Sequence, residues 1–177
     1  HPVTNPVTNT TLEPTPFYTT SLGFNENFPG GQPLDTVDLP RVFIISTGGT
    51  CSASEAVING LRGIDVEVVL IGSRTCGKPY GFYGTDNCGE TYFTIQFRGV
   101  NYKNFGDYSD GFAPENSATI GGVGEFIPGC VANDDFTNQL GNANENMLRT
   151  ALSYRENGVC PTNQNKNLLY ADKSKYE

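Results

Sequence analysis

The feature that most constrains the fold is a strand, a helix and a second strand that follow one another between residues 41 and 71. Val42-Phe43-Ile44-Ile45-Ser46 is a short apolar run typical of a buried strand, and Val66–Ile71 is another. Between them, small and apolar residues recur at helical spacing on one face, and the helix is expected to end near Gly63. That face consists of Ala53, Ala56, Val57, Gly60 and Leu61. The pattern predicts a βαβ unit with parallel strands and a right-handed crossover, and therefore an α/β fold.

The chain around this unit is less regular. Residues 1–40 hold seven of the eleven prolines and no sustained period, which indicates an irregular lead-in. We therefore expect a Pro-rich lead-in over 1–40, one domain over 41–160 and a polar tail over 161–177.

Within that domain we expect a glycine- and aromatic-rich loop over 80–86 and then a strand over 91–97, where β-branched and aromatic residues gather. A long irregular stretch is expected over 99–132. The sequence then predicts a short helix over 134–140 and a longer one over 143–155.

Charge and hydropathy exclude several kinds of partner. The net charge is −8, the isoelectric point is about 4.6, and the eleven Lys and Arg residues form no run. Nucleic acid is therefore not expected as a partner, because its phosphates need a basic surface. No apolar stretch approaches the roughly 20 residues that a membrane-spanning helix needs, so no membrane span is expected.

Five cysteines, at positions 51, 76, 88, 130 and 160, permit two disulfides with one thiol left over. Cys76 and Cys88 flank a short loop, and Cys130 and Cys160 flank the expected C-terminal helices, so we predict these two pairs, although sequence alone does not define connectivity. Disulfides would indicate an oxidising, extracytoplasmic compartment. The alternative is five free thiols in a cytosolic protein.

Ser52 occupies the turn in which the first strand passes through two glycines into the helix. Its hydroxyl would lie beside the first-turn amides, whose positive dipole end favours a developing negative charge, so Ser52 is a candidate nucleophile. A structural role is the alternative, because Ser52-x-x-Glu55 matches a capping box, in which the serine caps the helix and the glutamate bonds back to it. Thr50 and Ser54 carry hydroxyls in the same turn.

Lys78, in Thr75-Cys76-Gly77-Lys78-Pro79, is a candidate general base. The only histidine is His1, at the terminus, so a serine nucleophile would need another base. Gly72-x-x-x-x-Gly77-Lys78 imitates a phosphate-binding loop, but Pro79 stands where that motif has Ser or Thr. A solvated surface lysine is the structural alternative. Five aromatic residues nearby, Tyr80, Phe82, Tyr83, Tyr92 and Phe93, would favour the base by excluding water from the ammonium.

The acidic residues do not form a metal-binding pattern. Asp107-x-x-Asp110-Gly111 and Asp134-Asp135 lack the spacing of a calcium loop, and turn-forming aspartates are the simpler interpretation. We expect neither a metal nor another cofactor.

Taken together, residues 41–81 resemble the tail-specific, or carboxyl-terminal-processing, serine peptidases. The resemblance lies in the apolar strand, Gly-Gly-x-x-Ser-Ala-Ser-Glu, the helix, the second strand and Thr75-Cys76-Gly77-Lys78. It implies Ser52 as nucleophile, Lys78 as general base and the backbone amide of Ala53 as an oxyanion donor. It also implies a crotonase- or ClpP-like spiral of β-β-α units, present here as a partial domain, and a protein or peptide substrate.

The chain departs from that family in three ways. Phe82 stands where the family often has a glutamine that orients the lysine, no upstream strand and loop supplies the second oxyanion donor, and no PDZ domain is recognisable. The resemblance therefore implies the C-terminal half of a peptidase domain, weak or inactive alone, with a missing N-terminal half as a possible partner. The alternatives are a non-catalytic module that binds a peptide or another ligand, and a hydrolase of another acyl substrate such as an ester.

Overall fold

The computed structural model describes residues 3–161, so the expected tail over 161–177 lies, apart from its first residue, outside the described part of the chain. Two compact units are present. One comprises residues 3–39 and 82–97, and the other comprises residues 40–81 and 98–161. The second unit contains the expected βαβ segment.

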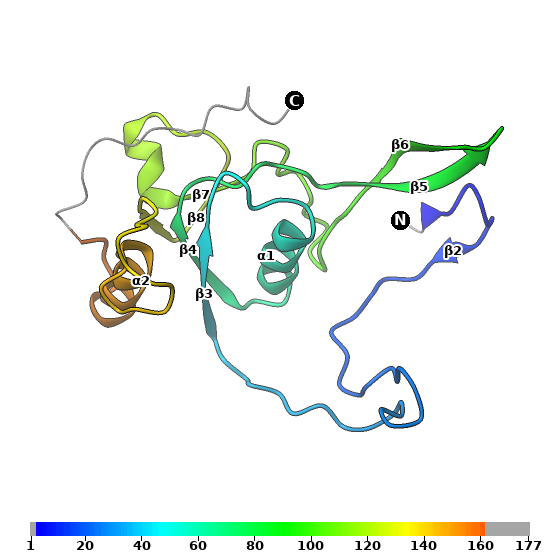
Figure 1. Cartoon of the computed structure of the whole chain (residues 1–177), viewed down its shortest axis with the longest axis horizontal. Helices are drawn as coiled ribbons and strands as arrows, with labels where there is room; N and C mark the ends of the chain where they lie inside the picture. The colour runs from blue at the N-terminus through cyan, green and yellow to red at the C-terminus, as the bar shows by residue number, and fades with distance from the viewer. Residues whose placement is uncertain (1–2, 162–177) are drawn as a thin grey trace. The chain divides into compact units, whose positions relative to one another are not determined.

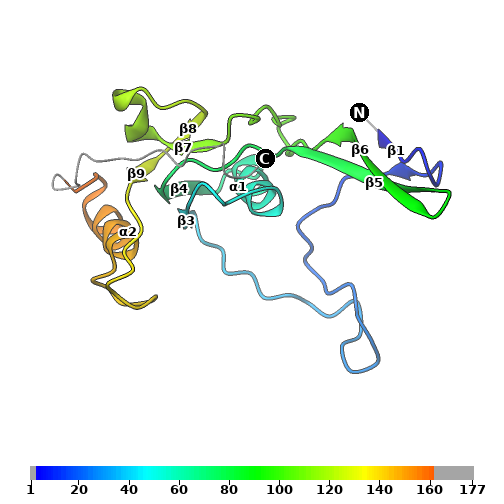
Figure 2. The same ribbon diagram turned by 45° about the horizontal axis from the view of Figure 1, so that its top comes forward.

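A three-stranded parallel sheet forms the centre of the second unit (Figure 1). Strand β3 (Arg41–Ser46) pairs with β4 (Glu67–Gly72) from Arg41↔Glu67 to Ser46↔Gly72. Strand β9 (Gly129–Val131) pairs with the other edge of β4, again in parallel, and Figure 2 shows the order β3-β4-β9 from another side. The predicted pair of parallel strands is confirmed.

The two faces of β4 pack against different helices, because its side chains alternate between them. On one face Val68 and Leu70 lie in a buried cluster with Ile58 of α1 (Ala53–Gly63). On the other face Val69 and Ile71 lie in a second cluster with residues of α2 (Asn146–Asn157). The sheet is thus covered by α1 on one face and α2 on the other, which is a small α/β arrangement (Figure 1).

Helix α1 runs over the predicted residues, but its predicted apolar face is wrong. Ala53, Ala56 and Val57 are exposed, and the buried residues are instead Glu55, Ile58, Asn59 and Gly63. Two of these are polar, and each is buried because it bonds a neighbouring loop: Glu55 accepts from residues 75–78, and Asn59 donates to the carbonyl of Phe105 at 2.9 Å. A hydropathy pattern does not register a helix face that is buried through hydrogen bonds.

The stretch expected to be irregular, 99–132, contains four short elements. Strand β7 (Phe112–Pro114) pairs in parallel with β8 (Glu125–Ile127). Along the chain, the 3-10 helix η1 (Glu115–Ile120) connects these two strands, and β9 follows β8. Three-residue strands carry no measurable periodicity, so sequence patterns do not reveal them. Gly129 allows β9 to reach the sheet, since a Cβ at this position would lie 1.8 Å from the carbonyl oxygen of Leu70.

The predicted helix over 134–140 does not form. The Asp135 carboxylate accepts the backbone N–H of Thr137 at 3.0 Å, an Asx turn that competes with helical hydrogen bonding. The next helix, α2, begins at Asn146 rather than Ala143 because Glu145 caps it, its carboxylate accepting the amides of Met147 and Leu148.

The first unit holds most of a β-hairpin and two very short strands. The hairpin joins β5 (Tyr80–Asn87) to β6 (Glu90–Arg98), and β1 (Val3–Thr4) pairs antiparallel with β2 (Thr11–Leu12). The expected loop over 80–86 is therefore wrong, since it lies within strand β5, whereas the strand expected over 91–97 is confirmed. Cys88 and Gly89 form the turn with φ values of 52° and 83°, as a tight hairpin turn requires.

Candidate active site

Ser52 lies between β3 and α1, immediately before the first helical residue, and it is exposed. Its backbone has φ 54° and ψ −108°, a conformation that residues other than glycine rarely adopt. A sharp, strained turn from strand to helix is how α/β hydrolases present a nucleophilic serine. The local backbone is thus one that holds a hydroxyl at the surface of a strand-to-helix turn.

A buried carboxylate, that of Glu55, fixes this turn to the loop that follows β4. Glu55 is 0% exposed, and its oxygen Oε2 accepts the backbone N–H of Ser52 at 2.9 Å and that of Lys78 at 2.8 Å. Its other oxygen, Oε1, accepts the N–H of Gly77 at 2.7 Å and the hydroxyl of Thr75 at 2.5 Å. A buried charge is tolerated only when it is hydrogen-bonded in this way.

The two interpretations of Ser52, as a candidate nucleophile and as part of a capping box, are compatible in this arrangement. The Glu55 half of the capping box is present, and the Ser52 hydroxyl faces the Glu55 amide without a hydrogen bond of ordinary geometry. Glu55 therefore does more than cap a helix, because it also binds the lysine loop. The capping-box spacing was the sequence signal for Glu55, but it gave no indication of the second role.

Thr75 connects the carboxylate to the next strand. It is 2% exposed, its hydroxyl donates to Glu55, and the same oxygen accepts the N–H of Phe112 at 2.8 Å. The backbone N–H of Thr75 donates to the carbonyl of Phe112 at 2.9 Å. The lysine loop is thereby attached to β7 as well as to α1.

Lys78 itself is exposed, and so is Ser52, whereas Pro79 beside the lysine is buried. Of the five aromatic residues expected to exclude water from Lys78, only Tyr80 belongs to the same unit, and Tyr80 is itself 44% exposed. The structure brings Ser52 and Lys78 together through their backbones, whose amides share Oε2 of Glu55. Ala53, the expected oxyanion donor, opens α1, where the first N–H groups have no partner within the helix.

A disulfide crosses between the same two segments. Cys51, which precedes Ser52, is bonded to Cys76, and their Cα atoms are 5.3 Å apart. The predicted Cys76–Cys88 pair is therefore wrong, and Cys88 is a free, exposed thiol, whereas the predicted Cys130–Cys160 pair is confirmed. Two disulfides are typical of a protein in an oxidising environment.

Tyr108 lies on the core side of the carboxylate. Its ring stacks on that of Phe112 with centroids 4.6 Å apart, and it is almost fully buried. Burial, and to a lesser extent the negative charge of Glu55, raise the pKa of Tyr108 above its usual value near 10. Tyr108 is therefore a neutral phenol at physiological pH.

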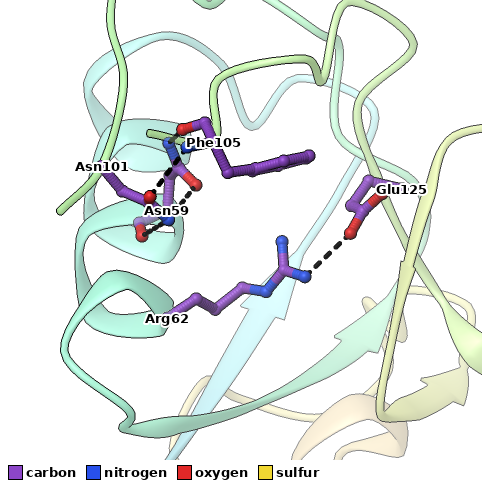
Figure 3. A network of polar contacts seen from close by, with 5 residues as sticks. All are labelled: Asn59, Arg62, Asn101, Phe105 and Glu125. Carbon is purple, nitrogen blue, oxygen red and sulfur yellow. Dashed lines mark hydrogen bonds and ion pairs between the residues drawn. The ribbon is translucent and has the colours of Figure 1, made fainter. Parts of the chain in front are cut away.

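A polar network, drawn in Figure 3, holds α1 at its other end. Asn101 donates to the backbone carbonyl of Asn59 at 3.1 Å and to its side-chain oxygen at 3.0 Å. Arg62 pairs with Glu125 at 2.8 Å, and its guanidinium lies 5.4 Å from the ring centroid of Phe105. These contacts fix the helix that presents Ser52, so they support the candidate site without belonging to it.

Comparison with known proteins identifies the fold. No model of a known protein family matches the chain, and no curated protein matches it. Among solved structures it resembles the "Putative S41 protease" of Bacteroides fragilis NCTC 9343, with 24% sequence identity and a TM-score of 0.50. The likeness covers 70% of this chain and 29% of that protease chain. The protein therefore has a partial α/β scaffold of the kind found in an S41 protease.

In the part of the chain that the structure describes, no helix is long and apolar enough to cross a bilayer. The same part holds no cluster of three or more His, Cys, Asp or Glu side chains suited to a metal ion.

Proposed function

We propose that this chain carries the nucleophile and the general base of a serine peptidase of the tail-specific type, which hydrolyses peptide bonds with a Ser52/Lys78 dyad. The observation that carries the proposal is the Ser52 backbone at φ 54°, whose N–H donates a hydrogen bond to the Glu55 carboxylate that also accepts the Lys78 amide. Strain of this kind persists where the surroundings over-determine it, as at catalytic turns. The crotonase-like spiral belongs to the same proposal.

In the proposed reaction Lys78, in its neutral form, accepts the proton of the Ser52 hydroxyl while the Ser52 oxygen attacks the scissile carbonyl. The tetrahedral oxyanion is stabilised by the amide of Ala53. Its collapse expels the amine, which takes the proton from Lys78, and leaves an acyl-serine. Water then attacks the ester while Lys78 accepts its proton, and Lys78 returns that proton to the Ser52 oxygen as the acid product leaves, which restores the free serine and the neutral lysine.

The site needs a further segment to be fully active. The chain spans 29% of the protease it resembles, and it lacks the upstream strand and loop that the tail-specific family uses as the second oxyanion donor. We propose that an N-terminal half of the peptidase domain, in the same protein or in a partner chain, supplies that donor. Each missing donor lowers the rate roughly 10²- to 10³-fold. The two disulfides favour an extracytoplasmic location.

The proposal is tested with a fluorophosphonate probe, which forms a covalent bond with an activated serine, on the protein as its host expresses it. We expect labelling that Ser52→Ala abolishes and Lys78→Ala lowers at least about 100-fold, because general-base catalysis is worth 10²- to 10⁴-fold. Ser54→Ala is the matched control, since Ser54 is an exposed hydroxyl in the first turn of the same helix. Labelling that survives in Ser52→Ala would remove the nucleophile assignment.

A second candidate function is a non-catalytic module that binds a peptide on a peptidase-like scaffold. The exposure of Lys78 favours it, and so does Phe82, which stands where the family often has a lysine-orienting glutamine and packs edge-to-face on Phe93 at a centroid distance of 5.4 Å. A crystal structure of the natural protein distinguishes the two functions. Lys78 Nζ within about 3.2 Å of Ser52 Oγ identifies the enzyme, and Lys78 directed into solvent identifies the binding module. An esterase would use the same dyad and is distinguished by its substrates.

A further inference from the structure

We infer that the Cys51–Cys76 disulfide positions the nucleophile, so that its reduction reversibly lowers the reactivity of Ser52. The inference rests on the proposed function. Cys51 directly precedes Ser52, and Cys76 precedes Lys78 by two residues, so the covalent link joins the two segments that carry the dyad. The other disulfide, Cys130–Cys160, joins β9 to the segment after α2 and touches neither segment.

The Ser52 backbone needs restraints on both sides, because its positive φ is unfavourable for a residue with a side chain. On the helical side the Ser52 amide donates a hydrogen bond to Glu55, and the Ser52 carbonyl accepts one from the Ala56 amide. On the strand side two links tie the chain to the lysine loop: the disulfide of Cys51, and a hydrogen bond of 3.1 Å from the Cys76 amide to the carbonyl of Thr50. Opening the disulfide leaves this side held by hydrogen bonds without a covalent link, and Ser52 gains freedom to relax toward an ordinary φ.

Such a relaxation would move both reacting groups of the turn. A change in φ and ψ of Ser52 moves its side-chain hydroxyl relative to the amide of Ala53, so the nucleophile and the oxyanion donor would lose their alignment together. Displacement of a reacting group by about 1 Å can lower a rate about 100-fold. The core would be largely unaffected, because β3, β4 and α1 are held by the sheet register and by buried side chains.

The disulfide is also the more accessible of the two. Both cysteines of this pair are partly exposed, whereas in the Cys130–Cys160 pair only Cys160 is partly exposed and Cys130 is 0% exposed. A dithiol reductant transfers two electrons and two protons to Cys51–Cys76, which gives two thiols, and is itself oxidised to a cyclic disulfide. Graded treatment with dithiothreitol should therefore open Cys51–Cys76 first, and alkylation followed by mass spectrometry identifies which pair has opened.

The test measures the rate of fluorophosphonate labelling in the natural protein in three states: oxidised, selectively reduced and reoxidised. We expect reduction of Cys51–Cys76 to lower the Ser52-dependent rate about 10- to 100-fold and reoxidation to restore it. The double variant Cys51→Ala with Cys76→Ala should label as slowly as the reduced protein and should not respond to dithiothreitol. If that variant does not fold, the selectively reduced protein gives the same comparison.

A second measurement is independent of catalysis. Hydrogen exchange should become faster in the amides of Ser52 and Lys78 on reduction, and should stay unchanged in β4, which serves as the internal reference. Unchanged labelling together with unchanged exchange would overturn the inference and leave the proposed function intact. If Ser52 is not labelled even in the oxidised protein, the proposed function fails, and exchange alone decides whether the disulfide positions this turn.

Discussion

The backbone amides of Ser52 and Lys78 donate to one and the same atom, Oε2 of the buried Glu55 carboxylate. Two segments separated by a helix and a strand are thereby held within hydrogen-bonding distance of a single oxygen. Because the acceptor has no contact with solvent, neither amide can exchange it for water without opening the structure.

Replacing Glu55 by glutamine should destabilise the fold by about 2–4 kcal/mol. The substitution keeps the shape but puts an NH₂ group where the carboxylate accepts from two of its four donors, and it removes the charge that strengthens all four hydrogen bonds. Urea denaturation measures the change in the free energy of unfolding. Glu156→Gln is the control, since that side chain is 67% exposed, and we expect a change below about 0.5 kcal/mol. Equal effects of the two variants would contradict the role assigned to Glu55.

Comparing Gly77→Ala in the lysine loop with Gly89→Ala in the hairpin turn separates the cost of a steric clash from the cost of a positive φ. Both glycines have φ near 84°, but a Cβ at Gly77 would lie 2.1 Å from the carbonyl oxygen of Ser109, whereas nothing lies within 4 Å of a Cβ at Gly89. We expect Gly89→Ala to cost about 1–2 kcal/mol from the positive φ alone and Gly77→Ala to cost at least about 2 kcal/mol more. Thermal unfolding measures both. Similar melting temperatures for the two variants would contradict this expectation, because they would show that the lysine loop can shift away from the Ser109 carbonyl at little cost.

Arg62→Lys should destabilise the protein by about 1–2 kcal/mol although the charge is kept. Figure 3 shows Arg62 paired with Glu125 beside Phe105. The guanidinium lies 5.4 Å from the centroids of the Phe105 and Phe112 rings, and an ammonium lacks the planar face for this stacking. Arg155→Lys, at an exposed position, is the matched control and should be nearly neutral. Chemical denaturation of both variants checks the difference, and a neutral Arg62→Lys would contradict it.

Stability should fall at alkaline pH because of Tyr108. Its folded-state pKa is raised above the unfolded value, so above about pH 10 the unfolded chain releases a proton that the folded chain retains. The free energy of unfolding then decreases as pH rises. Denaturation at pH 9 and pH 11 measures the decrease, which Tyr108→Phe should diminish. Tyr102→Phe, at an 88% exposed residue, should leave it unchanged, and a decrease of the same size in Tyr108→Phe would assign it to other groups.

The cysteine pairing shows why part of the site was missed. Cys51 and Cys76 each follow the end of a strand by a few residues, and Ser46 and Gly72, which end those strands, are register partners. Parallel pairing therefore puts the two following loops side by side, and the predicted βαβ unit already contained that signal. Loop length between neighbouring cysteines was a poorer guide, because it led to the incorrect Cys76–Cys88 pair.

The sequence by itself determined the parallel pair β3 and β4 with the helix between them, because apolar periodicity is a local property that strand and helix geometry convert directly into burial. It also predicted Ser52 and Lys78 as a catalytic pair, which stays a prediction. Only the tertiary structure decided which face of α1 is buried, which cysteines are joined and how the Ser52 turn is held. Each of these depends on polar groups that are distant in sequence, above all the Glu55 carboxylate, whose burial is stable only because four donors from the turn and the lysine loop converge on it.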